Sequence, residues 1–120
     1  TLLDDYAWYY NNSTLKTKPV ASKLPNAKGL YDMYGNVSEW VSDWYSISAY
    51  DTEAWPDESK DTNGSIINPQ GPPSGAGTYR VIRGGSWNDL AAYARTADRN
   101  FDLPDNRGNN LGFRLLRTYP

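Results

Sequence analysis

The side chains that could do chemistry in this 120-residue chain are carboxylates, amides, lysines, arginines and aromatic rings, because the sequence contains no cysteine and no histidine. Without these two residue types the chain has no thiol nucleophile, no imidazole base, no disulfide and none of the usual ligands of zinc or haem. The absence of cysteine leaves the redox compartment open. Most familiar enzyme classes are therefore excluded, and recognition through hydrogen bonds, charge and aromatic contact stays possible.

The composition is that of an ordinary globular domain. Hydrophobic residues make up 38% and charged residues 22% of the chain, and the formal net charge is −2. These values argue against a disordered tail and against a nucleic-acid binder. No stretch approaches the roughly 18 apolar residues of a membrane-spanning helix. The length predicts one domain over residues 1–120. The charge and the short apolar stretches predict no nucleic-acid partner and no membrane span.

The basic residues are divided by type along the chain. Every lysine lies at or before Lys60, and every arginine lies at or after Arg80. A guanidinium binds carboxylates through two parallel hydrogen bonds and stacks on aromatic rings, so the C-terminal part is the richer contact surface. We expect most of these arginines to hold loops in place, namely Arg83, Arg95, Arg99 and Arg114.

Few regular elements are expected to position these groups. From Glu39 onward, Trp40, Ser42 and Trp44 alternate with Val41, Asp43 and Tyr45, a period of two that predicts a strand with large aromatic residues on one face. Further strands are predicted at 80–87 and 111–116, and residues 2–10 are either a short helix or an edge segment. Turn-forming residues predict loops at 46–78 and 98–110. Within the first loop, Asp61–Gly64 resembles the start of a calcium loop, but Pro72 replaces the required glutamate, so a plain turn is expected.

Three stretches together resemble one known family. They are GLYDMYGNVSEW at 29–40, RGGSW at 83–87 and LGFRL at 111–115, and their order and spacing are similar to those of the formylglycine-generating enzyme (sulfatase-modifying factor) family. Residues 68–69 and 71–75 match its connecting loop. The resemblance implies an α+β, C-type-lectin-like fold with short antiparallel strands and much irregular loop. It covers only the C-terminal part of that domain, which implies that a further segment completes it.

The resemblance also bears on catalysis. Oxidising members of the family use two cysteines with copper, and in this chain the corresponding stretch, residues 87–94, reads WNDLAAYA. Related sulfoxide synthases bind non-haem iron through histidine, which is absent here. The 120 residues are therefore expected to be non-catalytic unless a missing portion supplies the ligands.

A calcium site is implied by the same resemblance. Its ligands would be the side chains of Asp32 and Glu39 and the main-chain carbonyls of Gly35 and Val37. Calcium takes six to eight oxygen ligands at ~2.3–2.6 Å, and carboxylates at both ends of a tight turn supply several of them. Gly35 permits such a turn. The alternative is that the two carboxylates cap a turn or pair with arginine.

Residues 88–110 are rich in asparagine, aspartate, tyrosine and arginine, a composition suited to adaptable hydrogen bonding around aromatic anchors. The stretch also resembles the variable region of proteins diversified by retroelements, although asparagine-rich turns are common in this fold. The expected ligand contacts, on this stretch and at its edge, are Trp87, Asn88, Asp89, Tyr93, Asp98, Asn100, Phe101 and Asp102.

The sequence therefore favours a calcium-stabilised, non-catalytic binding module for a protein or small-molecule ligand. Two alternatives stay open: a part of a family enzyme whose catalytic ligands lie on the missing N-terminal portion, and a structural component of a bacterial surface assembly. The resemblance suggests an extracytoplasmic or cell-surface location in a bacterium.

Overall fold

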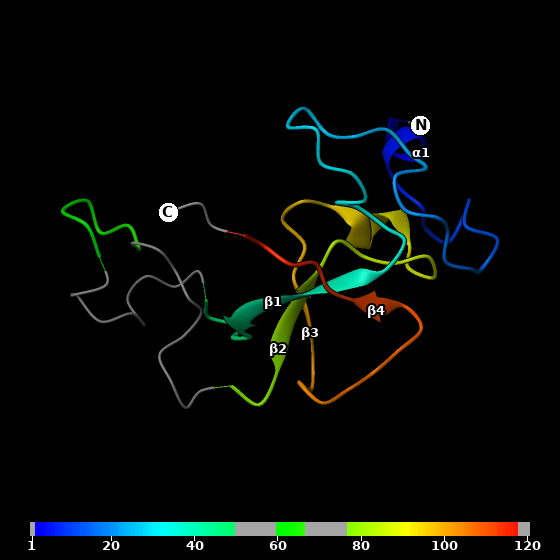
Figure 1. The fold of residues 1–120 in the computed structure, drawn as a ribbon. Helices are drawn as coiled ribbons and strands as arrows, with labels where there is room; N and C mark the ends of the chain where they lie inside the picture. Colours follow the sequence, from blue (N-terminus) through cyan, green and yellow to red (C-terminus); the bar gives the residue numbers. More distant parts are fainter. Residues whose placement is uncertain (1, 50–59, 67–76, 118–120) are drawn as a thin grey trace. The chain divides into compact units, whose positions relative to one another are not determined.

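The computed structural model describes residues 2–49, 60–66 and 77–117, and its regular elements are short (Figure 1). A four-stranded sheet has the strand order β3-β2-β1-β4, and β4 runs parallel to β1 with Ser38 opposite Leu111 and Glu39 opposite Gly112. The small sheet, few helices and long irregular connections confirm the α+β class. In chain order the elements are α1 (Leu2–Tyr6), β1 (Ser38–Trp44), β2 (Arg80–Arg83), the 3-10 helix η3 (Ala91–Ala94), β3 (Asn100–Asp102) and β4 (Leu111–Gly112).

The strand predicted from the aromatic alternation is confirmed as β1, and residues 2–6 form the short helix rather than an edge segment. Two other strands are shorter than predicted. β2 ends at Arg83 because Gly84 and Gly85 have φ values of +90° and +66°, which an extended strand cannot contain. β4 ends at Gly112, two residues before Arg114 directs its side chain onto Glu39.

Two of the predicted loops contain strand pairing that their composition does not indicate. The loop prediction for 98–110 is wrong at Asn100–Asp102, which form β3, because pairing with a neighbouring strand overrides local propensity. Lys60 pairs with Ile66 around a plain turn, in which the Asp61 carboxylate accepts bonds from the N–H groups of Asn63 and Ser65. The rest of the 46–78 prediction, from 50 to 59 and from 67 to 76, lies outside the described residues.

Contacts divide the chain into two compact units. The first unit contains residues 1–40, 82–99 and 107–120, and the second contains 41–81 and 100–106. In the second unit the Phe101 ring lies 4.3 Å from Tyr45 and 4.9 Å from Tyr79, measured between ring centroids. The Arg80 guanidinium lies 3.6 Å above the Trp44 ring. Aromatic and cation–π contacts therefore hold this unit together.

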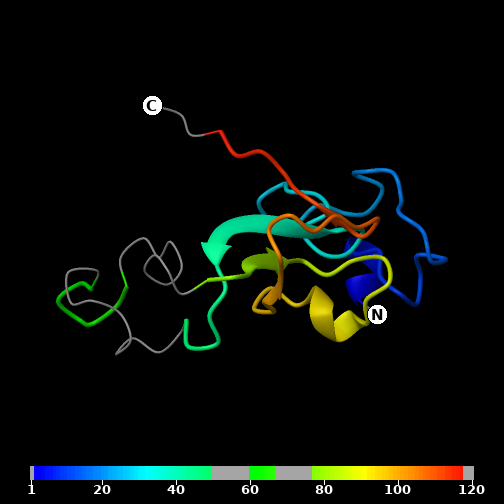
Figure 2. The same ribbon diagram turned by 90° about the horizontal axis from the view of Figure 1, so that it is seen from below.

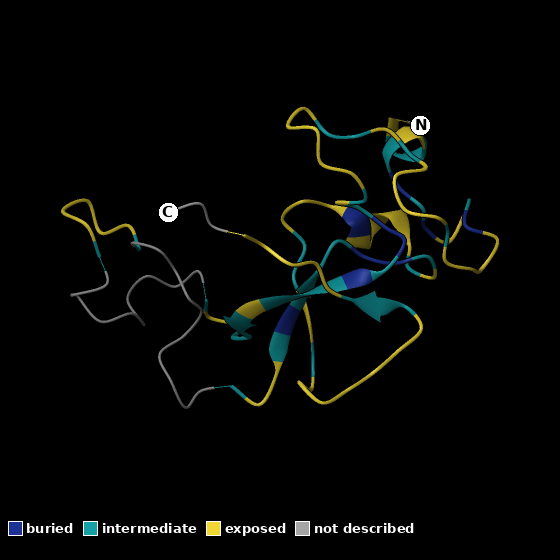
Figure 3. Cartoon of the chain, in the orientation of Figure 1, coloured by how far each residue is buried: buried dark blue, intermediate teal, exposed yellow. Residues whose placement is uncertain are grey.

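The first unit is built around a buried Gly35-Asn36 backbone. Gly35 N–H donates to Gly84 O (2.8 Å), Asn36 N–H donates to Trp8 O (2.7 Å), and Asn36 O accepts from Trp87 N–H (2.8 Å). Three distant stretches thus meet in the first unit, which contains most of the buried residues of the described chain (dark blue in Figure 3). Nearby, α1 lies beside η3 (Figures 1 and 2).

Within the described ranges, the structure contains no helix that is both long and apolar enough to cross a membrane.

Candidate functional site

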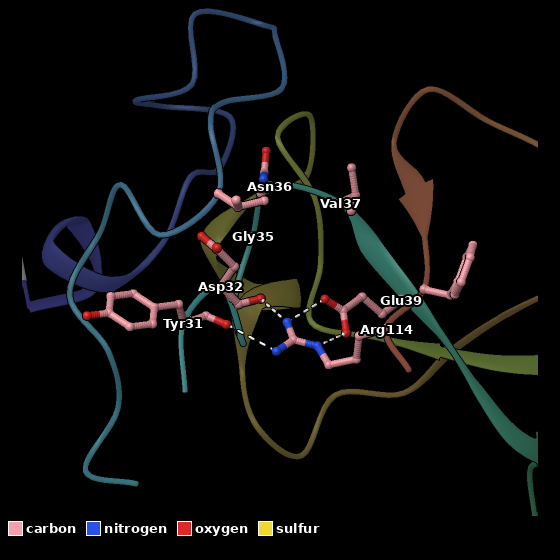
Figure 4. A pocket seen from close by; sticks show the side chains of 9 residues that line it. Tyr31, Asp32, Gly35, Asn36, Val37, Glu39 and Arg114 are labelled. Carbon is pink, nitrogen blue, oxygen red and sulfur yellow. Dashed lines mark hydrogen bonds and ion pairs between the residues drawn. The ribbon is translucent and has the colours of Figure 1, made fainter. Parts of the chain in front are cut away.

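The stretch from Tyr31 to Glu39, here called the 31–39 loop, lines a pocket of about 290 Å³ in the first unit (Figure 4). All four residues of the predicted calcium site line this pocket. The turn is built from residues in the left-handed region: φ is +54° at Asp32, +73° at Gly35 and +66° at Asn36. The full lining is Val20, Tyr31, Asp32, Gly35, Asn36, Val37, Glu39, Phe113 and Arg114.

The guanidinium of Arg114 closes this loop. Its Nε donates to Glu39 Oε2 (2.6 Å) and its Nη2 donates to Glu39 Oε1 (2.5 Å), which makes a two-pronged ion pair. Nη2 also donates to the Asp32 carbonyl (2.9 Å), and Nη1 donates to the Tyr31 carbonyl (3.2 Å). Four bonds from one side chain therefore join both ends of the loop, as the dashed lines of Figure 4 show.

These contacts raise the pKa of the Arg114 guanidinium above its already high ordinary value. The largest cause is the hydrogen bond with Glu39. Partial burial lowers the pKa, and the charges of Glu39 and Asp32 raise it further. Arg114 consequently stays charged at every pH at which the protein would be studied.

The Asp32 carboxylate is directed elsewhere. Its Oδ2 accepts a hydrogen bond from Ala21 N–H (2.7 Å), and Figure 4 shows the side chain pointing away from the Arg114 guanidinium. The donor types of the loop suit calcium, since carboxylate and carbonyl oxygens are its preferred ligands. In this arrangement, however, Arg114 already supplies the positive charge at Glu39. Calcium at Asp32, Gly35, Val37 and Glu39 stays a prediction, and no cluster of three acidic side chains occurs in the part of the chain that is described.

A second pocket, of about 320 Å³, lies at Trp87 in the same unit and is called here the Trp87 pocket. Its walls are Leu15, Lys16, Thr17, Trp87 and Asn109. The indole Nε1 of Trp87 donates to the Asn109 carbonyl (3.2 Å), and the Trp87 carbonyl accepts from the buried Ser13 hydroxyl (2.7 Å). One hydrogen bond therefore holds the edge of the indole ring, and another holds the Trp87 backbone.

A polar network continues from this pocket. The fully buried Ser86 hydroxyl lies 2.7 Å from Asn88 Oδ1 and 2.5 Å from Asp89 Oδ2, and both oxygens are acceptors for its one proton. Asn110 Nδ2 donates to Asn88 Oδ1 (3.1 Å). The structure thus connects Trp87, Asn88 and Asp89, three of the predicted ligand contacts, with the end of the 88–110 stretch.

The other predicted contacts are not part of this network. Tyr93 is 45% exposed on η3, and the Asp98 carboxylate pairs with Arg95 (3.4 Å). Asn100, Phe101 and Asp102 form β3 in the second unit. Sequence reasoning missed the 15–17 wall of the pocket, because nothing in that polar, proline-flanked stretch signals proximity to Trp87.

Comparison with known proteins gives a consistent result. The chain matches the family described as "Sulfatase-modifying factor enzyme 1-like domain" over residues 1–119. The serine/threonine-protein kinase pkn1 of Chlamydia pneumoniae is 42% identical over 107 residues, which are 89% of this chain and 16% of the kinase. The formylglycine-generating enzyme of Streptomyces coelicolor is 40% identical over 103 residues, 83% of this chain and 29% of the enzyme.

Among solved structures, Treponema denticola variable protein 1 superposes with a TM-score of 0.73 at 39% identity, over 92% of this chain and 35% of that chain. This likeness confirms the C-type-lectin-like fold of the formylglycine-generating enzymes. The chain spans less than a third of the length of the two curated relatives.

Proposed function

Because the chain belongs to the sulfatase-modifying factor enzyme 1-like family, we propose that it is a non-catalytic binding module of that family, with the Trp87 pocket as its ligand-contact site. The observation that carries this proposal is the pocket itself, in which an indole, an amide and an aliphatic wall meet. Ligand sites typically combine apolar walls with a few placed polar groups, and tryptophan is a frequent anchor of binding energy.

The pocket is also held rigid before any ligand arrives. Ser13 fixes the Trp87 backbone, Asn109 fixes the indole edge, and Ser86 fixes the neighbouring Asn88. A pre-formed site loses little conformational entropy on binding, which favours affinity. Asn109, an exposed residue of the pocket wall, adds a polar group to the site.

Two further observations support binding rather than catalysis. The stretch that carries the cysteines of the oxidising family members has none in this chain, and the 120 residues contain no histidine. The chain is also similar to Treponema denticola variable protein 1, and a variable protein is consistent with a module that has a changeable contact surface.

The test does not require the natural ligand to be known. A random peptide library displayed on phage is selected for binding to the immobilised 120-residue protein. Peptides that bind the pocket should lose about thirtyfold or more in affinity for Trp87→Ala, since anchor residues contribute ~2 kcal/mol or more. Leu30→Ala is the matched control, because Leu30 is 46% exposed on a different loop. Circular dichroism of each variant checks that the fold is intact.

Trp87→Phe separates the ring from the N–H group and should retain part of the affinity. Selected peptides that bind wild type and folded Trp87→Ala equally well would contradict the proposal.

We also propose that calcium binds the 31–39 loop through Asp32, Gly35, Val37 and Glu39. The oxygen donors of this loop support the proposal. A ligand that binds only the folded state raises the unfolding temperature. Calcium should therefore raise the midpoint of wild type but not that of Asp32→Ala, and a chelator should reverse the rise. A midpoint indifferent to calcium would exclude the site.

The enzyme alternative rests on the 40% identity to a formylglycine-generating enzyme. Its test is to incubate the whole natural protein that contains this chain with copper, air and a cysteine-containing sulfatase peptide. An aldehyde product detected by mass spectrometry would support this alternative and overturn the non-catalytic proposal.

A further inference from the structure

We propose that the Trp87 pocket recognises an acidic peptide, in which a carboxylate side chain binds Lys16 and a neighbouring aromatic or aliphatic side chain packs on Trp87. This inference rests on the proposed function and specifies the chemical class of its ligand. It begins from Lys16, which is the one charged side chain among the five described residues of the pocket wall.

Lys16 is exposed, and within the described residues its ammonium group makes no hydrogen bond, ion pair or ring contact. The next two lysines of the chain are engaged. Lys18 Nζ donates to Thr14 Oγ1 (2.9 Å) and lies 5.3 Å from the centroid of the Trp8 ring. Lys23 Nζ lies 3.9 Å from the centroid of the same ring. Lys16 is therefore the lysine of this stretch that is available to a ligand.

The other polar groups of the wall also suit an anion. The Thr17 hydroxyl and the Asn109 side-chain amide have no intramolecular partner in the part of the chain that is described, and each can donate to an oxygen atom. No acidic side chain is among the described residues of the wall. Three donors therefore line one pocket, and the wall supplies no negative charge that would repel a carboxylate.

The chain around Lys16 is positively charged. From residue 6 to residue 31 the sequence contains four lysines and no aspartate or glutamate. Charges in solution act over about 8–10 Å at moderate salt, so this local charge influences the pocket more than the formal net charge of −2 does. The stretch that forms one wall of the pocket is thus complementary to an acidic ligand.

The apolar part of the wall requires an apolar neighbour for the carboxylate. The Trp87 ring is half-buried, Leu15 is 56% exposed, and both line the pocket. An ion pair at an exposed lysine contributes little on its own, so packing on these two side chains provides most of the affinity. The volume of about 320 Å³ is near the lower end for ligand sites, so one or two residues of a peptide fill it.

The first measurement compares selections from the phage library on immobilised wild type, Lys16→Gln and Lys28→Gln, read by sequencing. On wild type, acidic residues next to aromatic or aliphatic residues should be enriched about threefold or more, and Lys16→Gln should abolish this enrichment. Lys28→Gln is the matched control and should keep it. This variant removes the same charge from an exposed position of the first unit that is outside the pocket wall.

The second measurement is calorimetric titration with one selected peptide and with the same peptide in which the acidic side chain is replaced by its amide. Both peptides carry a C-terminal amide, so the side chain is the carboxylate under test. Its removal should weaken binding to wild type about fivefold, and binding to Lys16→Gln about twofold or less. Raising sodium chloride from about 0.05 M to about 0.5 M should reduce the difference between the two peptides on wild type.

Asn109→Asp is a second variant of nearly unchanged shape. It places a carboxylate in the pocket wall, which repels the carboxylate of the peptide and pairs with Lys16. Binding of the acidic peptide should therefore weaken about fivefold or more, while binding of the amide peptide should change about twofold or less. Circular dichroism of each variant checks that the fold is intact.

The outcomes separate this inference from the proposal on which it rests. Binding that requires Trp87, with a preference for acidic residues that requires Lys16, supports both. Binding that requires Trp87 but shows no preference for acidic residues keeps the ligand-contact site and overturns the inference. A preference that persists in folded Lys16→Gln also overturns it. If no selected peptide depends on Trp87, the ligand-contact site and the inference both fall.

Discussion

Gly35 is the residue at which a single added methyl group should damage this fold most. A Cβ at this position would lie 2.1 Å from the Trp8 carbonyl oxygen and 2.7 Å from its carbon, and φ is +73°. Backbone atoms cannot rotate away as a flexible side chain can, so the Trp8 and Gly35 stretches must separate. Their separation breaks the 2.7 Å bond from Asn36 N–H to Trp8 O.

The expected loss for Gly35→Ala combines three effects. The left-handed conformation costs an L-residue about 1 kcal/mol, overpacking costs about 1–3 kcal/mol, and the lost hydrogen bond costs about 1 kcal/mol. We therefore predict that the free energy of unfolding falls by about 3–5 kcal/mol. With a urea slope of about 1.5 kcal/mol/M, the midpoint should fall by about 2 M or more.

Gly29→Ala is the matched control. Its φ of +76° is almost the same, but a Cβ there meets no atom within 4 Å. It should cost only the backbone strain, about 1 kcal/mol. Urea unfolding of both variants, followed by circular dichroism, measures the difference. Equal losses for the two variants would refute the argument that a close approach of Trp8 requires glycine at this position.

Three further predictions concern polar contacts. Arg114→Gln should lower the free energy of unfolding by about 1–2 kcal/mol in urea, a moderate loss because the ion pair is partly exposed. The raised pKa of the Arg114 guanidinium keeps this group charged at both pH 7 and pH 10, so the loss should be equal at the two values. Ser86→Ala leaves the Asp89 carboxylate without its buried donor and should lower the free energy of unfolding by about 1–3 kcal/mol. An unchanged thermal unfolding midpoint would contradict this prediction. Arg80→Gln removes the cation over Trp44 and should cost about 0.5–2 kcal/mol, and an unchanged tryptophan emission spectrum would argue against that contact.

The sequence predicts the parts of this fold that local patterns encode. The period-of-two pattern identifies β1, and Gly35 identifies the turn in the 31–39 loop. Local patterns do not encode where a strand finds a partner. For that reason β3 was expected to be loop, and β4 was expected to extend to Leu116.

The candidate sites show the same limit. Glu39 and Arg114 are 75 residues apart, and the sequence indicates only that a carboxylate of this type pairs with some arginine. Trp87 was expected at the ligand surface, but its pocket needs Leu15 to Thr17 from a stretch with no chemical signature. Long-range contacts of this kind are settled by the packing of the whole unit, not by the spacing of residues.

The most direct test of the binding proposal is a nuclear magnetic resonance titration of the ¹⁵N-labelled protein with a peptide selected from the library. The proposal predicts that the indole N–H signal of Trp87 shifts most among the five tryptophans, together with the backbone signals of Lys16, Thr17 and Asn109. Saturation with peptide that leaves the Trp87 signal unchanged, with shifts confined to the 31–39 loop or to the Trp44 signal, would contradict it.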